Sequence, residues 1–365
     1  MKIASSQHID AEETSRGAGL PIKLINKFLD EHFYGFKKYM EVAGFWQGQS
    51  TCVKSLMKMW FLIVFTFSAG SEFVGFYRSY RKNERMSLEA VTDSIFETST
   101  VLIIVSLYLL YQPKLKKFKS FLDFAVADCR RMLRSEEADV FMEFANFYYK
   151  LAMLYLGMFM VMIPSAIIFP VTMPLLLNYV VPGNTSFEPI IITQAYVGFE
   201  PREHILPFLF LLLNFGAAMA LCLNACSSSL LFAVIFLVVK FKVIGCRLDK
   251  LYKRLNDDRV VQFSVEYNQD LLYRHIKELI KDHASCYEVL GQIAALSGNV
   301  LFVALGNAIF DLIISGTMIV YQFDNNPDHC LKMGTAACCS LMSGFALCFI
   351  GQLVTDASDE IFDKA

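Results

Sequence analysis

The most constraining feature of the sequence is an apolar run of 35 residues, Ile205–Val239, that contains no charged side chain. As one α-helix this run would be about 52 Å long, against a bilayer hydrocarbon core of roughly 30 Å. Tilt would have to reach about 55° to absorb the difference, which exceeds the roughly 40° limit of membrane helices. We therefore predict a membrane-spanning helix that continues beyond the bilayer at one end.

The composition indicates that this span is one of several. Hydrophobic residues make up 55% of the 365 residues and charged residues only 19%, whereas soluble domains average about 45–50% and about 25%. We predict an all-α membrane protein, a multi-span helical bundle with a cytosolic helical anchor. The other five spans are expected at about Met59–Tyr77, Asp93–Tyr111, Tyr148–Pro174, Ile293–Tyr321 and Met333–Val354.

The distribution of Lys and Arg predicts the orientation of these six spans. The segments 1–57, 112–146 and 240–292 carry twenty-four basic residues, and the three alternate connections carry six. By the positive-inside rule, both termini lie in the cytoplasm. The predicted organisation has four parts. A cytosolic N-terminal segment (1–57) is followed by spans one to four with their loops (58–239). A cytosolic helical anchor (240–292) then precedes spans five and six with a short cytosolic tail (293–365).

Several local features refine this outline. Apolar residues recur at helical spacing from Pro21 to Phe36, which predicts an amphipathic helix that packs on the rest of the protein, after a disordered start up to about Gly19. Prolines remove backbone hydrogen bonds, so we expect a kink near Pro164 and a helix end near Pro174. The basic segment after Pro113 keeps an apolar stripe, which indicates that it continues the second helix.

The sequence offers no sign of an enzyme, a cofactor or a nucleic-acid partner. It has no Gly-x-Ser-x-Gly elbow, Walker loop or His-Glu-x-x-His motif, and its six histidines are scattered. The ten cysteines fall mostly in spans or in predicted cytosolic segments, so neither a disulfide framework nor a metal site is expected. A membrane-embedded hydrolase is the weakest alternative. The lipid bilayer is the expected partner of the spans.

Asp93, Glu97 and Asp311 are acidic residues at predicted membrane depth. Asp93 and Glu97 are one helical turn apart on the second span, and Asp311 lies within the fifth. A charge at the centre of a span costs about 2.5–3.5 kcal/mol on the insertion scale, so such residues usually face protein or water. We interpret Asp93 as an interfacial residue. For Glu97 and Asp311, an interfacial or packing role and a role in a ligand pocket are both open.

The outer halves of the second, third and fourth spans carry aromatic, Met and hydroxyl side chains at helical spacing. Such a surface suits an adaptable pocket for small volatile molecules, although residues of this kind also face lipid or a neighbouring helix. The predicted ligand-binding residues are Phe96, Ser99, Ile103, Phe159, Met162, Ser165, Phe208, Leu212 and Phe215. The long connection after the third span contains a sequon at Asn184, and glycosylation there requires a lumenal position.

The C-terminal third resembles the insect odorant receptor family. The resemblance is carried by LIKDHASCYEVLGQIAALSGNVLFVALGNAIFDLI (Leu279–Ile313), with His283 at the foot of the fifth span, and by GFALCFIGQLVTDASDEIFDKA at the end. The overlong fourth span, the long cytosolic helices and the inside N-terminus agree with it. The resemblance implies a multi-pass plasma-membrane subunit of a ligand-gated cation channel, which binds odorants and assembles with a co-receptor subunit.

The resemblance also implies a pore-lining seventh span directly after Ala365, where this sequence ends. Either the sequence is a truncated product, or the chain cannot supply its share of a pore. Within the same superfamily, a gustatory receptor would share the topology. A secondary transporter is the alternative from another class, but it would need internal repeats and broken helices that the sequence does not show. A G-protein-coupled receptor is opposed by the predicted orientation.

Overall fold

A computed structural model describes residues 21–46, 48–81, 88–180, 203–256, 265–323 and 327–364, together with Gly198. Within these ranges the chain is almost entirely helical and has no strand. Six of the described helices are long and apolar enough to cross a membrane, which confirms the predicted all-α multi-span class. The elements are α1 (Ile22–Val42), α2 (Thr51–Arg81), α3 (Leu88–Tyr111), the 3-10 turn η1 (Gln112–Lys114), α4 (Leu115–Leu133), α5 (Ala138–Val180), α6 (Ile205–Asn256), α7 (Val265–Gln322) and α8 (Pro327–Lys364).

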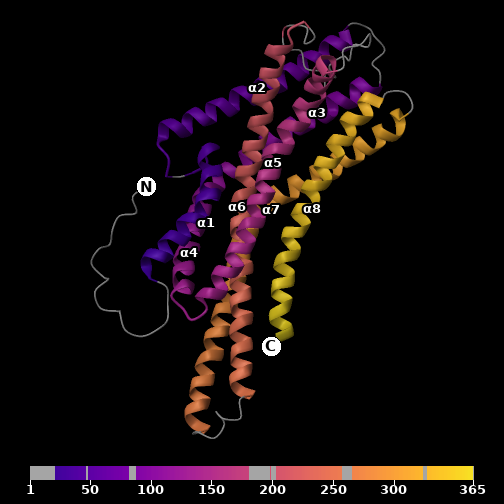
Figure 1. Ribbon diagram of the computed structural model, residues 1–365. Helices are drawn as coiled ribbons and strands as arrows, with labels where there is room; N and C mark the ends of the chain where they lie inside the picture. Colours follow the sequence, from indigo (N-terminus) through magenta and orange to yellow (C-terminus); the bar gives the residue numbers. More distant parts are fainter. Residues whose placement is uncertain are drawn as a thin grey trace.

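Helix α6 is the centre of the molecule, and the other helices surround it (Figure 1). In its most apolar stretch 78% of the residues are buried, against 17–28% in the corresponding stretches of the other five candidate spans. Leu237, Val238 and Phe241 are almost completely enclosed. The helix has 52 residues, so the prediction of a span that continues beyond the bilayer thickness is confirmed.

Helix α1 packs on the bundle along its apolar face, as its periodicity predicts. Ile25, Leu29 and Phe36 are buried, and the Phe36 ring lies edge-on to Phe232 of α6 at 5.6 Å between centroids. The chain leaves α1 through Gly44, which has a positive φ of 73°. A Cβ atom there would lie 2.8 Å from the Met57 Cβ atom, so this turn favours glycine for both its conformation and its space.

The helix boundaries near the prolines agree with prediction at one site and differ at another. The second predicted span continues through η1 into α4 with only the short 3-10 turn around Pro113 between them. Helix α5 runs to Val180, so the predicted helix end near Pro174 is wrong. A proline removes one intrahelical hydrogen bond but leaves the flanking bonds available, and neighbouring helices can support the helix beyond it.

The last two helices are longer than the predicted spans. Helix α7 has 58 residues and joins the later part of the predicted anchor segment 240–292 to the fifth span without a break. Helix α8 includes most of the predicted C-terminal tail, where the Lys364 ammonium lies 2.8 Å from the Asp249 carboxylate of α6. In Figure 1 the joined ends of α6 and α7 project beyond the other helices, on the same end of the molecule as α1 and α4. The segments that are richest in Lys and Arg therefore share one end.

Candidate functional site

A large cavity lies among α2, α3, α5, α6, α7 and α8, at the end of the bundle away from the α6–α7 projection, α1 and α4. Its volume is about 650 Å³, within the range of about 300–1,000 Å³ that is usual for small-molecule sites. Most of its wall is aliphatic or aromatic. The aromatic side chains come from α2, α3, α5 and α6, namely Trp60, Phe67, Phe96, Tyr155, Phe159, Phe208, Phe210 and Phe215. The cavity therefore suits a compact and mainly apolar molecule.

Seven of the nine residues proposed from the sequence lie in this wall: Phe96, Ile103, Phe159, Met162, Phe208, Leu212 and Phe215. The two serines do not. The Ser99 hydroxyl donates a hydrogen bond to the Phe96 carbonyl oxygen of its own helix at 2.8 Å, and Ser165 is exposed on the surface of α5. A helical serine can satisfy its hydroxyl on the preceding turn, so spacing alone does not bring it into a cavity. Asn184 lies outside the described residues.

The nine residues proposed from the sequence include none from α2, α7 or α8, although Asp311 of α7, for which a pocket role was open, does line the cavity. Trp60, Ser71 and Glu72 of α2 line the cavity, and Glu72 is buried. A signal for α2 was present, because Glu72 interrupts an otherwise apolar span and ionisable residues at such depth face protein or water.

An ion-pair triad joins α3 to α8 beside the cavity. The Lys332 ammonium lies 2.9 Å from the Asp93 carboxylate and 3.0 Å from the Glu97 carboxylate. Asp93 is buried in this triad and thus faces protein. Lys332 and Glu97 also line the cavity. The two carboxylates compensate the buried ammonium, whose charge would otherwise be costly in an apolar surrounding, so the triad fixes α3 against α8.

A second polar group lies in the wall between α7 and α8. The Asp311 carboxylate accepts hydrogen bonds at Oδ2 from the Asn307 amide, at 2.9 Å, and from the Ser340 hydroxyl, at 3.3 Å. All three residues line the cavity. The cavity thus combines a broad apolar wall with a few convergent polar groups, which is the usual composition of a small-molecule site.

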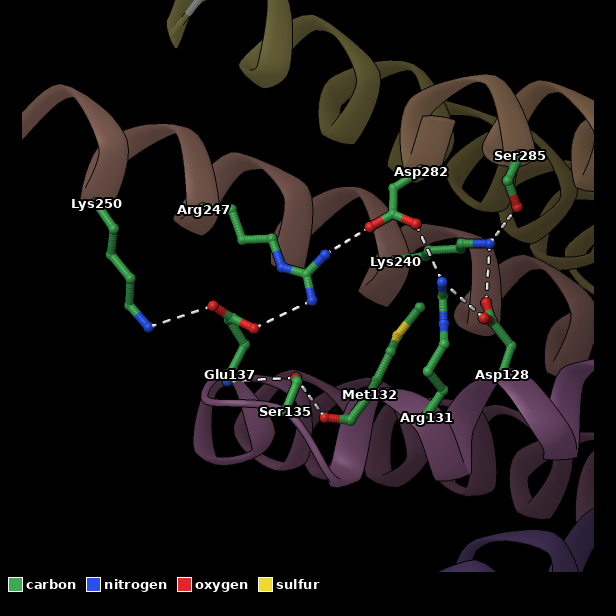
Figure 2. Close-up of polar contacts among 10 residues, drawn as sticks. All are labelled: Asp128, Arg131, Met132, Ser135, Glu137, Lys240, Arg247, Lys250, Asp282 and Ser285. Carbon is green, nitrogen blue, oxygen red and sulfur yellow. Dashed lines mark hydrogen bonds and ion pairs between the residues drawn. The ribbon is translucent and has the colours of Figure 1, made fainter. Parts of the chain in front are cut away.

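A network of charged residues ties α4, α6 and α7 together at the opposite end of the bundle (Figure 2). Lys240 of α6 is 1% exposed; its ammonium lies 2.8 Å from Asp128 and donates to the Ser285 hydroxyl at 2.6 Å. Arg131 lies 3.0 Å from both Asp128 and Asp282. These bonds connect helices that are far apart in the sequence, so they hold the three helices in one arrangement.

The same network reaches the turn before α5 through Glu137. Its carboxylate lies 3.1 Å from the Arg247 guanidinium and 3.6 Å from the Lys250 ammonium, and Arg247 also pairs with Asp282 (Figure 2). Burial alone would raise the pKa of Glu137, but the nearby Arg247, Ser135 and Lys250 lower that pKa below its ordinary value. Glu137 is therefore a carboxylate at neutral pH, and its ion pairs close the network.

The fold defines a polytopic helical membrane protein with a large, mainly apolar cavity among its helices. A family model described as 7tm Odorant receptor matches residues 87–365, so the chain belongs to the odorant receptor family. Its fold is similar to the solved structure of the insect olfactory receptor OR5 from Machilis hrabei, with a TM-score of 0.62 and 10% sequence identity, over 91% of this chain and 82% of that chain. Comparison with curated protein sequences finds no match.

Proposed function

We propose that the chain is an odorant receptor subunit that binds small volatile molecules in the cavity and, with a co-receptor subunit, gates cation flow across the plasma membrane. The single observation that carries this proposal is a large, mainly apolar cavity in a chain of the odorant receptor family. The residues Phe96, Phe159 and Phe208, proposed from the sequence, lie in its wall. The family match is to odorant receptors, which favours signalling over transport.

Two long helices connect the cavity to the charged network. Helix α6 carries Ser227 in the cavity wall and Lys240 in the network, and 13 residues of helix span about 20 Å. Helix α7 carries Asp282 in the network and Asp311 in the wall. A ligand that contacts the open state better than the closed state shifts the equilibrium between them. We propose that this shift reaches the far end of the bundle through α6 and α7.

Recordings from cells that express the full-length receptor together with an odorant receptor co-receptor test this function. We expect an inward cation current in response to at least one member of a broad panel of volatile molecules. Cells that express the co-receptor alone are the control and should not give this response. If the receptor reaches the cell surface and no volatile of the panel evokes a current beyond that of the control, the proposed function is wrong.

The proposed orientation places the N-terminus and the segments 1–57 and 240–292 in the cytoplasm, and Asn184 on the outer side. We expect a glycosidase to reduce the apparent mass of the expressed receptor and Asn184→Gln to abolish this change, because only lumenal sequons are glycosylated. A sequon added at the N-terminus should stay unmodified. Glycosylation of that added sequon would reverse the orientation and contradict this arrangement.

A further inference from the structure

The polar group at Asp311 has hydrogen-bonding capacity that the described residues do not use. The Asp311 side chain is 6% exposed, and its Oδ2 atom accepts the two hydrogen bonds from Asn307 and Ser340. Its Oδ1 atom and the Asn307 Oδ1 atom are also buried, and neither accepts a hydrogen bond from a described residue. Buried acceptors are nearly always paired in folded proteins. Two unused acceptors in a cavity wall therefore point to a ligand that brings hydrogen-bond donors.

The charge of the wall favours a donor that can become a cation. Its described acidic and basic side chains are the carboxyl groups of Glu72, Glu97 and Asp311 and the ammonium group of Lys332. Lys332 already pairs with Asp93 and Glu97. Within the described ranges, no cationic side chain lies within 4.0 Å of the Asp311 carboxyl group. A carboxylate in such a wall is costly without a counter-charge.

An amine relieves this cost without adding net charge to the membrane interior. If Asp311 is a neutral acid before the ligand arrives, a neutral amine takes the carboxyl proton, and the products are an ammonium and a carboxylate that attract each other. If Asp311 is already ionised, an ammonium ion supplies the counter-charge directly. A primary ammonium has three N–H donors, enough for both unused acceptors. An alcohol supplies one donor and cannot take the proton, and a hydrocarbon supplies none.

We propose that the cavity selects small primary amines with an apolar body, whose nitrogen hydrogen-bonds to Asp311. This inference rests on the proposed function, because it names the class of ligand for the same cavity. The aromatic and aliphatic remainder of the wall takes the apolar body, and Asp311 with Asn307 and Ser340 forms the polar anchor. Hydrogen bonds that involve a charged group contribute about 1.5–3 kcal/mol, which corresponds to a preference of at least about tenfold.

The two tryptophans of the chain allow a direct binding measurement. Trp60 lines the cavity, whereas Trp46 lies outside the cavity wall, near Lys37. Trp46→Phe in the 365-residue chain thus leaves Trp60 as its single tryptophan. Titration of this receptor in lipid nanodiscs with benzylamine, benzyl alcohol and toluene compares three ligands with one common ring. We expect benzylamine to bind at least about tenfold more tightly than toluene.

Asp311→Asn keeps the shape of the side chain and removes its charge and basicity. It should weaken benzylamine binding about tenfold and leave toluene binding unchanged. Asp356→Asn makes the same chemical change at an exposed position of α8. It should change neither benzylamine binding nor toluene binding. The comparison of ligands needs no substitution at Asp311, so it decides the inference even if Asp311→Asn is not recovered in folded form.

The outcomes separate the inference from the proposed function. Equal affinities for the three ligands, tighter binding of benzyl alcohol than of benzylamine, or equal losses for benzylamine and toluene in Asp311→Asn would each overturn the amine preference and leave the cavity as a ligand site. Failure of all three ligands to change Trp60 fluorescence would count against both the amine preference and the proposed function of the cavity as a ligand site.

Discussion

Asp128→Ala is expected to destabilise the folded receptor by about 3–5 kcal/mol, because it leaves the buried Lys240 ammonium without its counter-charge. Lys240 is 1% exposed, and its ammonium lies over the rings of Phe124 and Phe236, 5.7 and 5.8 Å from their centroids. After the substitution the charge would keep the Ser285 hydroxyl and these rings but would lose the Asp128 carboxylate. The fall in the thermal unfolding midpoint of the purified receptor measures this loss.

Two further variants show whether the loss comes from an unpaired charge. Asp128→Leu combined with Lys240→Met removes both charges and keeps similar volumes, so it should recover most of the stability that Asp128→Ala loses. Glu31→Ala breaks an exposed pair with Lys27, whose side chains are 62% and 70% exposed, and should cost less than about 1 kcal/mol. Similar losses in Asp128→Ala and Glu31→Ala would contradict the role assigned to Lys240.

The sequence was sufficient to predict the helical framework because that framework follows from local patterns. The length of the charge-free run before Lys240 identified α6 as an overlong helix, and the periodicity after Pro21 identified α1 and its buried face. Both signals depend on residues within one helix. The error at Pro174 has a different cause, since the end of a helix inside a bundle depends on neighbouring helices as well as on its own sequence.

The ion pairs were beyond the reach of the sequence because they join distant segments. Lys240 was counted as a basic flank of the fourth span, but its partner Asp128 comes from α4, 112 positions earlier. Lys332 was counted as a charge of an outer connection, yet it lies buried against Asp93 and Glu97 of α3. A count of charged residues gives the sign of a segment's net charge. Only the packing of the helices shows which charged side chains form ion pairs.

The cavity residues were partly predictable, because some of them recur at helical spacing within one helix and others do not. Aromatic spacing on single helices placed Phe96, Phe159 and Phe208 on the inner faces, and the structure brings these faces together around one volume. The same spacing could not reveal Ala336 or Ser340 of α8, because small residues carry no periodic signal of their own. A small residue in a cavity wall is nevertheless the best place to test the cavity, since it can be enlarged.

Ala336→Trp is therefore expected to raise the ligand concentration for half-maximal current at least about tenfold, or to abolish the response. Ala336 lines the cavity on α8, one turn after Lys332 and one turn before Ser340, so an indole ring there occupies space that the ligand needs. Overfilling of a packed site costs about 1–3 kcal/mol, and about 1.4 kcal/mol corresponds to tenfold in affinity. Current recordings with a ligand that activates the unmodified receptor measure the change.

The neighbouring residue supplies a matched control. Ala337 is partly exposed and lies outside the cavity wall, because successive residues of a helix are turned by about 100°. Ala337→Trp makes the same addition to the same helix and should change the half-maximal concentration less than twofold. In the series Ala336→Val, Ala336→Phe and Ala336→Trp the response should weaken stepwise with side-chain size, and more for large ligands than for small ones. An equal effect of the two tryptophans would mean that α8 responds to any bulky residue, and the cavity would lose its role as the ligand site.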